Sequence, residues 1–302
     1  MAKKDYLKRA TDYKRQIELL RSRGVLITDE QKAEEHLSDI GYYRLGFYIF
    51  PFEKTYPELG KKRDHGVKPG TKLEDVVAFY YYNVDLRNIL NKYLSRIEVA
   101  IRTTFIYELS NKYKDNPYWY VDPAIVDNKF INTFKSQFYK KIKEKEPIRR
   151  HHKKYYGDYA PAWKTMEYMT LGNLESLYDN LLSTADKALI SRKFGESAIN
   201  SFKSYLSVIR EVRNSCAHGN VIVGMALVDN VRTGVACPTI PMGTQNTFHG
   251  ALRVIRYMLG IVSANRAQEM MENIYNATRE LYSKAPTMQT LIEQKTGIIL
   301  PE

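Results

Sequence analysis

An arginine, an asparagine and a histidine lie close together near the end of the segment SYLSVIREVRNSCAHGN (204–220), as Arg213, Asn214 and His218. Cleaving RNA without a metal requires a base for the proton of the attacking 2′-hydroxyl, an acid for the leaving 5′-oxygen and a cation beside the phosphorane. Histidine can do either proton transfer near neutral pH, and arginine binds two phosphate oxygens at once. Asn214 could orient the pair or bind a phosphate oxygen. These residue types therefore indicate a candidate catalytic site for phosphodiester cleavage.

The pattern is weak support when taken alone. The chain is rich in arginine and has 6 histidines, so an arginine five residues before some histidine arises readily by chance. A solvent-facing histidine at the end of a helix is the simpler interpretation. His218 is also the only histidine of the segment, whereas the reaction needs both a base and an acid. A second copy of the chain would have to supply the other.

Apolar residues recur at helical spacing through this segment. We therefore expect a helix over 200–218 whose buried stripe consists of Tyr205, Leu206, Ile209, Val212 and Cys216. Arg213 then lies at the edge of that stripe, and Gly219-Asn220 ends the helix directly after His218. Positions five apart on an ideal helix are separated by about 140°, so the two side chains do not share a face. They can meet at one phosphate only if the helix end unwinds or if each also works with residues of a second chain.

The arrangement R-N-x-x-A-H at 213–218 resembles the R-x(4–6)-H motif of HEPN-domain ribonucleases. Three further segments resemble the Abi-like (abortive-infection) family of bacterial proteins, in the family's order and with comparable spacing. They are LSDIGYYRLGFYIFPF (37–52), DLRNILNKYLSRIEVAIR (85–102) and PAWKTMEYMTLGNLESLY (161–178). Together these segments are specific, and the resemblance covers most of the chain.

The resemblance implies an all-α fold with a HEPN-type helical bundle, and a homodimer in which two such motifs meet across the interface. It also implies metal-independent RNA cleavage that leaves a 2′,3′-cyclic phosphate, in an antiviral phage-defence or toxin–antitoxin setting. Carried over residue by residue, Arg213 and His218 take the catalytic places, with Asn214 beside them. Some members are associated with a small structured RNA that restrains them, so RNA is the expected partner as substrate and as inhibitor.

Positive charge is concentrated in one part of the chain. The sequence has 46 Lys and Arg against 34 Asp and Glu, a net charge of +12, which favours a polyanionic partner through counterion release and steering. Eight of these cations lie in the segment 140–157, with Glu144 and Glu146 as the only acids before Asp158. A solvated face is the alternative interpretation. The expected RNA-binding residues are Lys140, Lys141, Arg149, Arg150, His151, Lys153, Lys154 and Tyr155, together with Arg44 in the aromatic segment GYYR.

The composition argues against membrane, secreted, disulfide-rich and zinc-binding proteins. No apolar stretch is long enough to span a membrane and no secretory signal is recognisable, so we expect a cytoplasmic protein. Cys216 and Cys237 make neither a disulfide framework nor a zinc spacing, so we expect no protein-held metal and no cofactor. The leading interpretation is a ribonuclease toxin or defence effector. The alternatives are a non-catalytic RNA-binding module on the same fold and, least favoured by the charge, a regulatory protein–protein element.

Helical periodicity predicts an almost wholly helical chain around one long central helix at 72–113. On that helix Glu98 and Arg102 are spaced as an i,i+4 pair. A structural ion pair is the default interpretation, and bracing the motif or lining an RNA cleft is the alternative.

Capping boxes at Thr28/Gln31 and Thr71/Glu74 start two helices. Further helices are expected at 5–22, 28–40, 41–52, 124–143, 161–182, 185–194, 247–271, 273–283 and 287–296, with an exposed loop at 53–70 and a small hairpin or irregular loop at 221–239.

The expected organisation is an N-terminal helical segment, 1–70, packed on a HEPN-like helical domain, 71–302, or one continuous domain.

Overall fold

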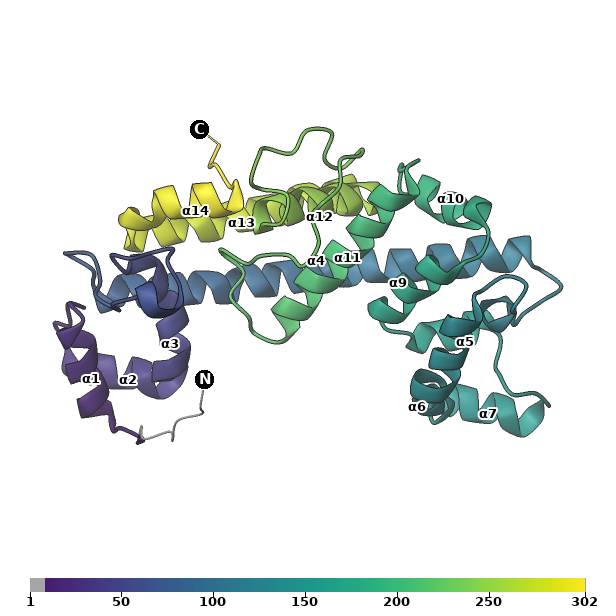
Figure 1. The fold of residues 1–302 in the computed structure, drawn as a ribbon, viewed down its shortest axis with the longest axis horizontal. Helices are drawn as coiled ribbons and strands as arrows, with labels where there is room; N and C mark the ends of the chain where they lie inside the picture. The colour runs from purple at the N-terminus through teal and green to yellow at the C-terminus, as the bar shows by residue number, and fades with distance from the viewer. Residues whose placement is uncertain (1–8, 302) are drawn as a thin grey trace. The chain divides into compact units, whose positions relative to one another are not determined.

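The computed structural model describes residues 9–301, and 67% of the chain is helical (Figure 1). Between residues 9 and 301 only isolated β-bridges occur and no strand forms, which confirms the expected all-α fold. No helix in this range combines the length and the apolar character that a membrane-spanning helix requires.

Contacts divide the chain into two compact units. Unit 1 consists of the described residues up to Asp85, Asn276–Leu291 and the last residues of the chain. Unit 2 consists of Leu86–Tyr275 and Ile292–Ile299, and it contains the Arg213–His218 motif. The division falls inside a long helix.

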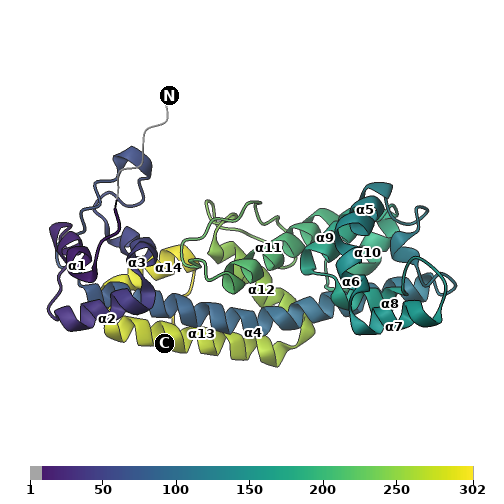
Figure 2. The same ribbon diagram turned by 90° about the horizontal axis from the view of Figure 1, so that it is seen from below.

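That long helix, α4 (Leu73–Lys112), carries the predicted apolar stripe. Every residue of the stripe is buried: Phe79, Leu86, Leu90, Tyr93, Ile97, Ile101 and Phe105. Helix α13 (Ala264–Lys284), whose residues up to Tyr275 belong to unit 2, lies along α4 (Figure 2). There Lys92 Nζ lies 2.7 Å from Glu269 Oε1, and Asn273 Nδ2 donates to the Tyr93 hydroxyl at 3.0 Å. Within unit 2 the long helix thus contacts α13 through polar side chains as well.

Four helices of unit 2 build the surroundings of the motif: α9 (Leu171–Asn180), α10 (Thr184–Lys193), α11 (Ile199–Ala217) and α12 (Phe248–Val262). Helix α11 contacts both α9 and α12 (Figure 1). Its predicted stripe is buried, from Tyr205 through Cys216. Because burial of this stripe fixes the rotation of α11, it also fixes the directions in which the polar residues of its last turns point.

Between α4 and α9 the chain forms short helices in place of the two long ones expected. They are η3 (Trp119–Val121), α5 (Asn128–Thr133), the π-helical turn η4 (Phe134–Tyr139), α6 (Lys140–Lys143), α7 (Glu146–Lys154), α8 (Ala162–Thr165) and η5 (Met166–Tyr168). The helix predicted at 161–182 is broken at Met169, which is extended (ψ 136°). The break arises because Thr170 starts a new helix with its own capping box to Asn173.

The connection between α11 and α12 is irregular, so the hairpin alternative for 221–239 is wrong and the irregular loop is correct. Side chains of α11 hold this connection in place of strand pairing. Ser201 Oγ donates to the Thr233 carbonyl at 2.6 Å, and the Tyr205 hydroxyl accepts from the Ala236 N–H at 3.3 Å. Cys216 and Cys237 are both free and buried.

Unit 1 contains α1 (Tyr13–Ser22), α2 (Glu30–Ile40), α3 (Tyr42–Ile49), η1 (Phe50–Phe52), η2 (Gly60–Lys62) and η6 (Pro286–Met288), together with the first part of α4, the last part of α13 and the start of α14 (Gln289–Thr296). Of the helix predicted at 5–22, residues 5–8 lie outside the described residues. Residues 9–12 are not helical, because the Asp12 carboxylate caps α1 by accepting from the Arg15 N–H.

Three other predicted helix ends are wrong. Asp29, not Thr28, caps α2 by accepting from the Lys32 N–H at 3.0 Å. The Thr71 hydroxyl donates to the Lys68 carbonyl instead of capping α4, which begins at Leu73. The break predicted near residue 272 lies at Ser263, whose extended backbone (φ −167°) separates α12 from α13.

Candidate active site

Helix α11 keeps its helical hydrogen bonds to the end of the motif. The N–H of His218, the residue that follows the last helical residue, still donates to the Asn214 carbonyl at 2.9 Å, and Gly219 comes next with a φ of 71°, in the left-handed region. The Asn220 N–H then closes the end by donating to the Ser215 carbonyl at 2.9 Å. The helix end therefore does not unwind, and Arg213 and His218 leave it about 140° apart.

Burial distinguishes the side chains of this last turn. The side chain of Arg213 is 45% exposed and His218 is exposed, so both reach solvent. Cys216, between them, is buried, and burial raises the pKa of its thiol to about 12. The thiol therefore stays protonated near neutral pH and cannot act as a nucleophile.

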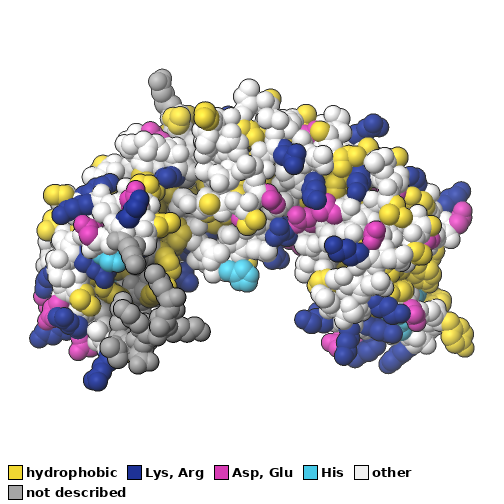
Figure 3. All heavy atoms as spheres, in the orientation of Figure 1, with side chains coloured by type: hydrophobic (Ala, Val, Ile, Leu, Met, Phe, Trp, Pro, Cys, Tyr) yellow, Lys and Arg dark blue, Asp and Glu magenta, His cyan; other side chains and the backbone are white. Residues whose placement is uncertain are grey.

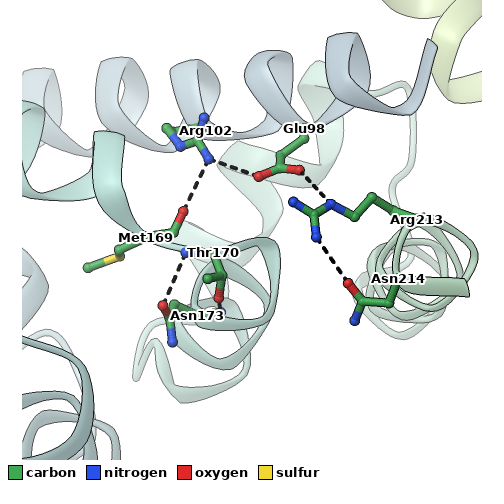
Figure 4. Close-up of polar contacts among 7 residues, drawn as sticks. All are labelled: Glu98, Arg102, Met169, Thr170, Asn173, Arg213 and Asn214. Carbon is green, nitrogen blue, oxygen red and sulfur yellow. Dashed lines mark hydrogen bonds and ion pairs between the residues drawn. The ribbon is translucent and has the colours of Figure 1, made fainter. Parts of the chain in front are cut away.

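Arg213 is held by a carboxylate from the central helix (Figure 4). Its Nε lies 3.4 Å from Glu98 Oε2, and its Nη1 donates to Asn214 Oδ1 at 3.3 Å. Glu98 Oε1 accepts in turn from Arg102 Nη2 at 3.0 Å. Glu98 and Arg102 are both largely buried, with 14% and 12% of their side chains exposed. The three charged side chains thus form a continuous chain that runs from the interior of unit 2 to the surface at Arg213.

The buried end of this row of charged side chains, Arg102, is fixed by the backbone at the start of α9. Arg102 Nη2 also donates to the Met169 carbonyl at 3.1 Å (Figure 4). This carbonyl is available because Met169 is extended and lies just before the capping box of Thr170 and Asn173. Sequence reasoning missed this contact, since it placed Met169 inside one continuous helix. The capping signal T-L-G-N at 170–173 could have located the break.

Two more contacts hold α11, and a third holds the residues that follow it. Arg210 Nε forms an ion pair with Glu175 of α9. Glu211, one residue further along α11, accepts from the Val228 N–H with both carboxylate oxygens, at 3.0 and 3.1 Å. The buried Arg87 of α4 donates to the Asn220 carbonyl at 3.1 Å. The backbone on both sides of His218 is therefore anchored within unit 2.

The predicted RNA-binding residues of the segment 140–157 form a basic surface on α6 and α7. Figure 3 shows dark-blue side chains gathered over these two helices. Glu146 pairs with Arg149 and lies 3.4 Å from Arg150, which partly neutralises those two arginines. The exposed residues of the basic surface are Lys140, Lys141, Lys143, Lys145, Arg149, Arg150, Lys153, Lys154 and Tyr155.

His151 differs from its neighbours because it is only 7% exposed. Its ring lies 5.0 Å from that of Tyr155, and within residues 9–301 neither ring nitrogen has a hydrogen-bond partner. Burial lowers its pKa, and the charge of Lys164 lowers it further. A buried neutral ring does not reach a polyanion on the surface, so we do not keep His151 among the expected RNA contacts. Arg44 is exposed on α3, in unit 1.

A family model described as an Abi-like protein matches residues 35–223. The matched range is more than half of the 302-residue chain and includes Glu98, Arg102 and the Arg213–His218 motif. No curated protein and no solved structure shows a significant match.

Proposed function

The chain belongs to the Abi-like protein family, and from this membership and the geometry around Arg213 we propose that it is a metal-independent endoribonuclease acting in abortive infection. The observation that carries the proposal is an arginine held at the surface by a buried carboxylate, five residues before an exposed histidine that ends the same helix. An arginine and a histidine presented in this way supply the charge and the proton transfer that the reaction needs.

Arg213 binds the phosphate in the proposed reaction. Its Nε and Nη1 face Glu98 and Asn214, which leaves the Nη2 amino group for a phosphate oxygen. Asn214 orients the guanidinium. As the 2′-oxygen attacks phosphorus and the bond to the 5′-oxygen breaks, Arg213 stabilises the charge on the phosphorane.

His218 takes the proton transfers. One histidine removes the 2′-hydroxyl proton and another protonates the leaving 5′-oxygen, which gives a 2′,3′-cyclic phosphate and a 5′-hydroxyl. Each chain supplies one histidine at this place, and α11 does not unwind to turn Arg213 towards it. We therefore assign the active unit to a homodimer in which a two-fold axis brings two Arg213/His218 motifs to one phosphate.

The test compares labelled RNA cleavage by the wild-type protein, His218→Ala and Arg213→Ala in EDTA. Arg256→Ala, an exposed arginine of α12, is the matched control. Loss of proton transfer lowers the rate by about 10²–10⁴, and loss of a transition-state donor by about 10²–10³. We expect wild-type and control proteins to cleave, and a single 2′-deoxy substitution at the cut site to abolish cleavage there. Unchanged RNA binding without cleavage in the wild type would instead establish the non-catalytic RNA-binding module.

RNA then acts on this protein in two ways, as the substrate and as a structured inhibitor. A restraining RNA would co-purify with the protein from its host and lower the rate of cleavage when added back. Nuclease treatment before assay is expected to raise the activity, and protein that is nucleic-acid-free and equally active from the start would remove the inhibitor from the proposal.

A further inference from the structure

A cavity of about 350 Å³ lies in unit 2 beside the basic surface. One wall comes from the turn after α4 and the other from the segment that follows α7. Pockets for small ligands measure about 300–1,000 Å³, so this cavity suits one small group. Its polar and aromatic lining consists of Asn116, Tyr118, Asp122, Tyr156, Asp158 and Tyr159.

The wall after α4 is held rigidly by its own hydrogen bonds. Asn116 Nδ2 donates to Asp122 Oδ2 at 2.6 Å, and Asn116 Oδ1 accepts from the Tyr118 N–H at 3.0 Å. Asp122 Oδ1 accepts from the Ala124 N–H at 2.8 Å. The position of Tyr118 is therefore set before any ligand arrives, which lowers the entropic cost of binding.

On the opposite side of the cavity, the ring of Tyr159 is held by packing, whereas the ring of Tyr156 is fully exposed to solvent. The ring of Tyr159 packs on that of Tyr139, with centroids 4.8 Å apart. Tyr156 is 104% exposed, so nothing in the described chain covers its ring. Between them Gly157 has a φ of +125°, a left-handed conformation that L side chains rarely adopt. The glycine makes the turn that presents Tyr156 at the mouth of the cavity.

The charges that line the cavity determine which part of a nucleic acid can bind in it. Asp122 and Asp158 line the cavity, and their carboxylates repel phosphate. Asp158 is 78% exposed, with Lys135 Nζ 3.7 Å away, so it can still accept from a ligand N–H. Lys153 and Lys154 lie directly before this segment on α7 and attract phosphate. A cavity with aromatic walls and acidic groups beside a basic helix fits a neutral, flat group with N–H donors, attached to a phosphate chain.

We infer that this cavity holds one unpaired RNA base between tyrosine rings while the adjoining phosphates lie along α7. The inference rests on the proposed RNA binding and names the form of RNA that is bound. Single-stranded RNA is recognised by splayed bases that stack on aromatic rings and hydrogen-bond through their edges. Bases with an exocyclic amino group can donate from it to Asp158, whereas the single N–H donor of uracil, at N3, lies between two carbonyl oxygens that repel the carboxylate. The site therefore favours an unpaired adenine, cytosine or guanine over uracil.

The experiment measures binding by fluorescence anisotropy in the His218→Ala background, so that RNA stays intact. The probes are ten-nucleotide single strands of A or U and a blunt duplex of the same length. Tyr156→Ala is expected to weaken binding of the A strand about 5-fold to 150-fold, the range found when a base-stacking aromatic is replaced by Ala. Tyr156→Phe keeps the ring and is expected to bind as the parent does. Asp158→Ala is expected to remove the preference for A over U.

The matched control is Tyr107→Ala, a 64% exposed tyrosine on α4 of the same unit, which should leave affinity unchanged. The duplex should bind Tyr156→Ala and its parent equally. Unchanged affinity in Tyr156→Ala together with weaker binding in a Lys153→Ala/Lys154→Ala variant would overturn the base pocket and keep RNA binding. Free AMP that binds as tightly as the A strand would overturn it too, in favour of a mononucleotide site. Cleavage by the protein with His218 intact, assayed separately in EDTA, reports on the proposed function whatever these variants do.

Discussion

Replacing Glu98 by Gln removes the carboxylate that joins Arg102 to Arg213. Breaking a fully buried ion pair from one side costs about 3–5 kcal/mol, whereas an exposed pair is worth about 0.2–1 kcal/mol. Arg102 and Glu98 are largely buried, but Arg213 is 45% exposed and solvent screens its contact. We therefore expect a stability loss of about 1–2 kcal/mol, mostly from the Arg102 side, and a fall in Tm of about 2–8 °C for a unit of this size.

The effect on the rate is expected to be smaller than the loss of Arg213 itself. The contact between Glu98 and Arg213 belongs to the exposed range, so its loss should lower kcat by about 2-fold to 5-fold. Arg213→Ala removes the guanidinium that binds the phosphate and should lower kcat by about 10²–10³. Arg213→Ala should therefore lower kcat more than Glu98→Gln does, because Glu98 positions the arginine without contacting the RNA.

Single-turnover cleavage and thermal unfolding measure the two effects separately. The control is Glu108→Gln, which removes an equally buried carboxylate of α4, 14% exposed and 3.0 Å from Lys193 Nζ. We expect it to lose stability while keeping the wild-type rate. If Glu98→Gln were as inactive as Arg213→Ala, the carboxylate would have a part in the chemistry. If it matched Glu108→Gln in both measurements, the positioning argument would be refuted.

Three further predictions follow from the basic surface, from His151 and from Cys216. Replacing Lys153 and Lys154 by Ala should weaken RNA binding and flatten its log–log salt dependence by about 0.7 for each phosphate that is no longer neutralised; the same change at Arg149 and Arg150, which Glu146 already pairs with, should flatten it less. Because the folded chain holds the pKa of His151 below its usual 6.5, the stability from its neutral ring is present above that pH and lost as pH falls below it. The Tm of wild type should therefore fall more steeply from pH 8 to 5 than that of His151→Phe, and parallel curves would contradict this. Iodoacetamide should leave Cys216 unmodified in the folded protein, as peptide mass analysis would report, since its pKa is raised to about 12.

Periodic features of the sequence predicted the scaffold well. The buried stripes of α4 and α11 were readable because burial repeats every three to four residues along a helix. The end of α11 was readable because Gly219 is the residue type that a left-handed helix end requires. These features are local, so they leave a signal within a few residues of sequence.

The parts of the site that were not predicted depend on contacts between distant segments. Glu98 and Arg102 were recognised as a pair, but nothing in the spacing joins Glu98 to Arg213 across 115 positions. The role of the Met169 carbonyl depends on a helix break that the apolar pattern of 161–182 conceals. The burial of His151 depends on how α7 packs: the adjacent Arg150 and His152 are polar or charged, and Ile148, one turn earlier, is the buried apolar residue of the same helix. A charge run predicts a basic surface without showing which of its members faces inward.

The most direct test of the account mixes Arg213→Ala and His218→Ala protomers, each inactive alone, and assays the mixture in EDTA for products that end in a 2′,3′-cyclic phosphate. Because each heterodimer retains one Arg213 and one His218 on different chains, a site shared across a two-fold axis should cleave RNA, at a rate about 10²–10⁴ below that of the wild type because one of its two histidines is missing. Heterodimers shown to form but unable to cleave would contradict the shared site. A wild-type protein that stays monomeric at micromolar concentration yet cleaves RNA would contradict it as well.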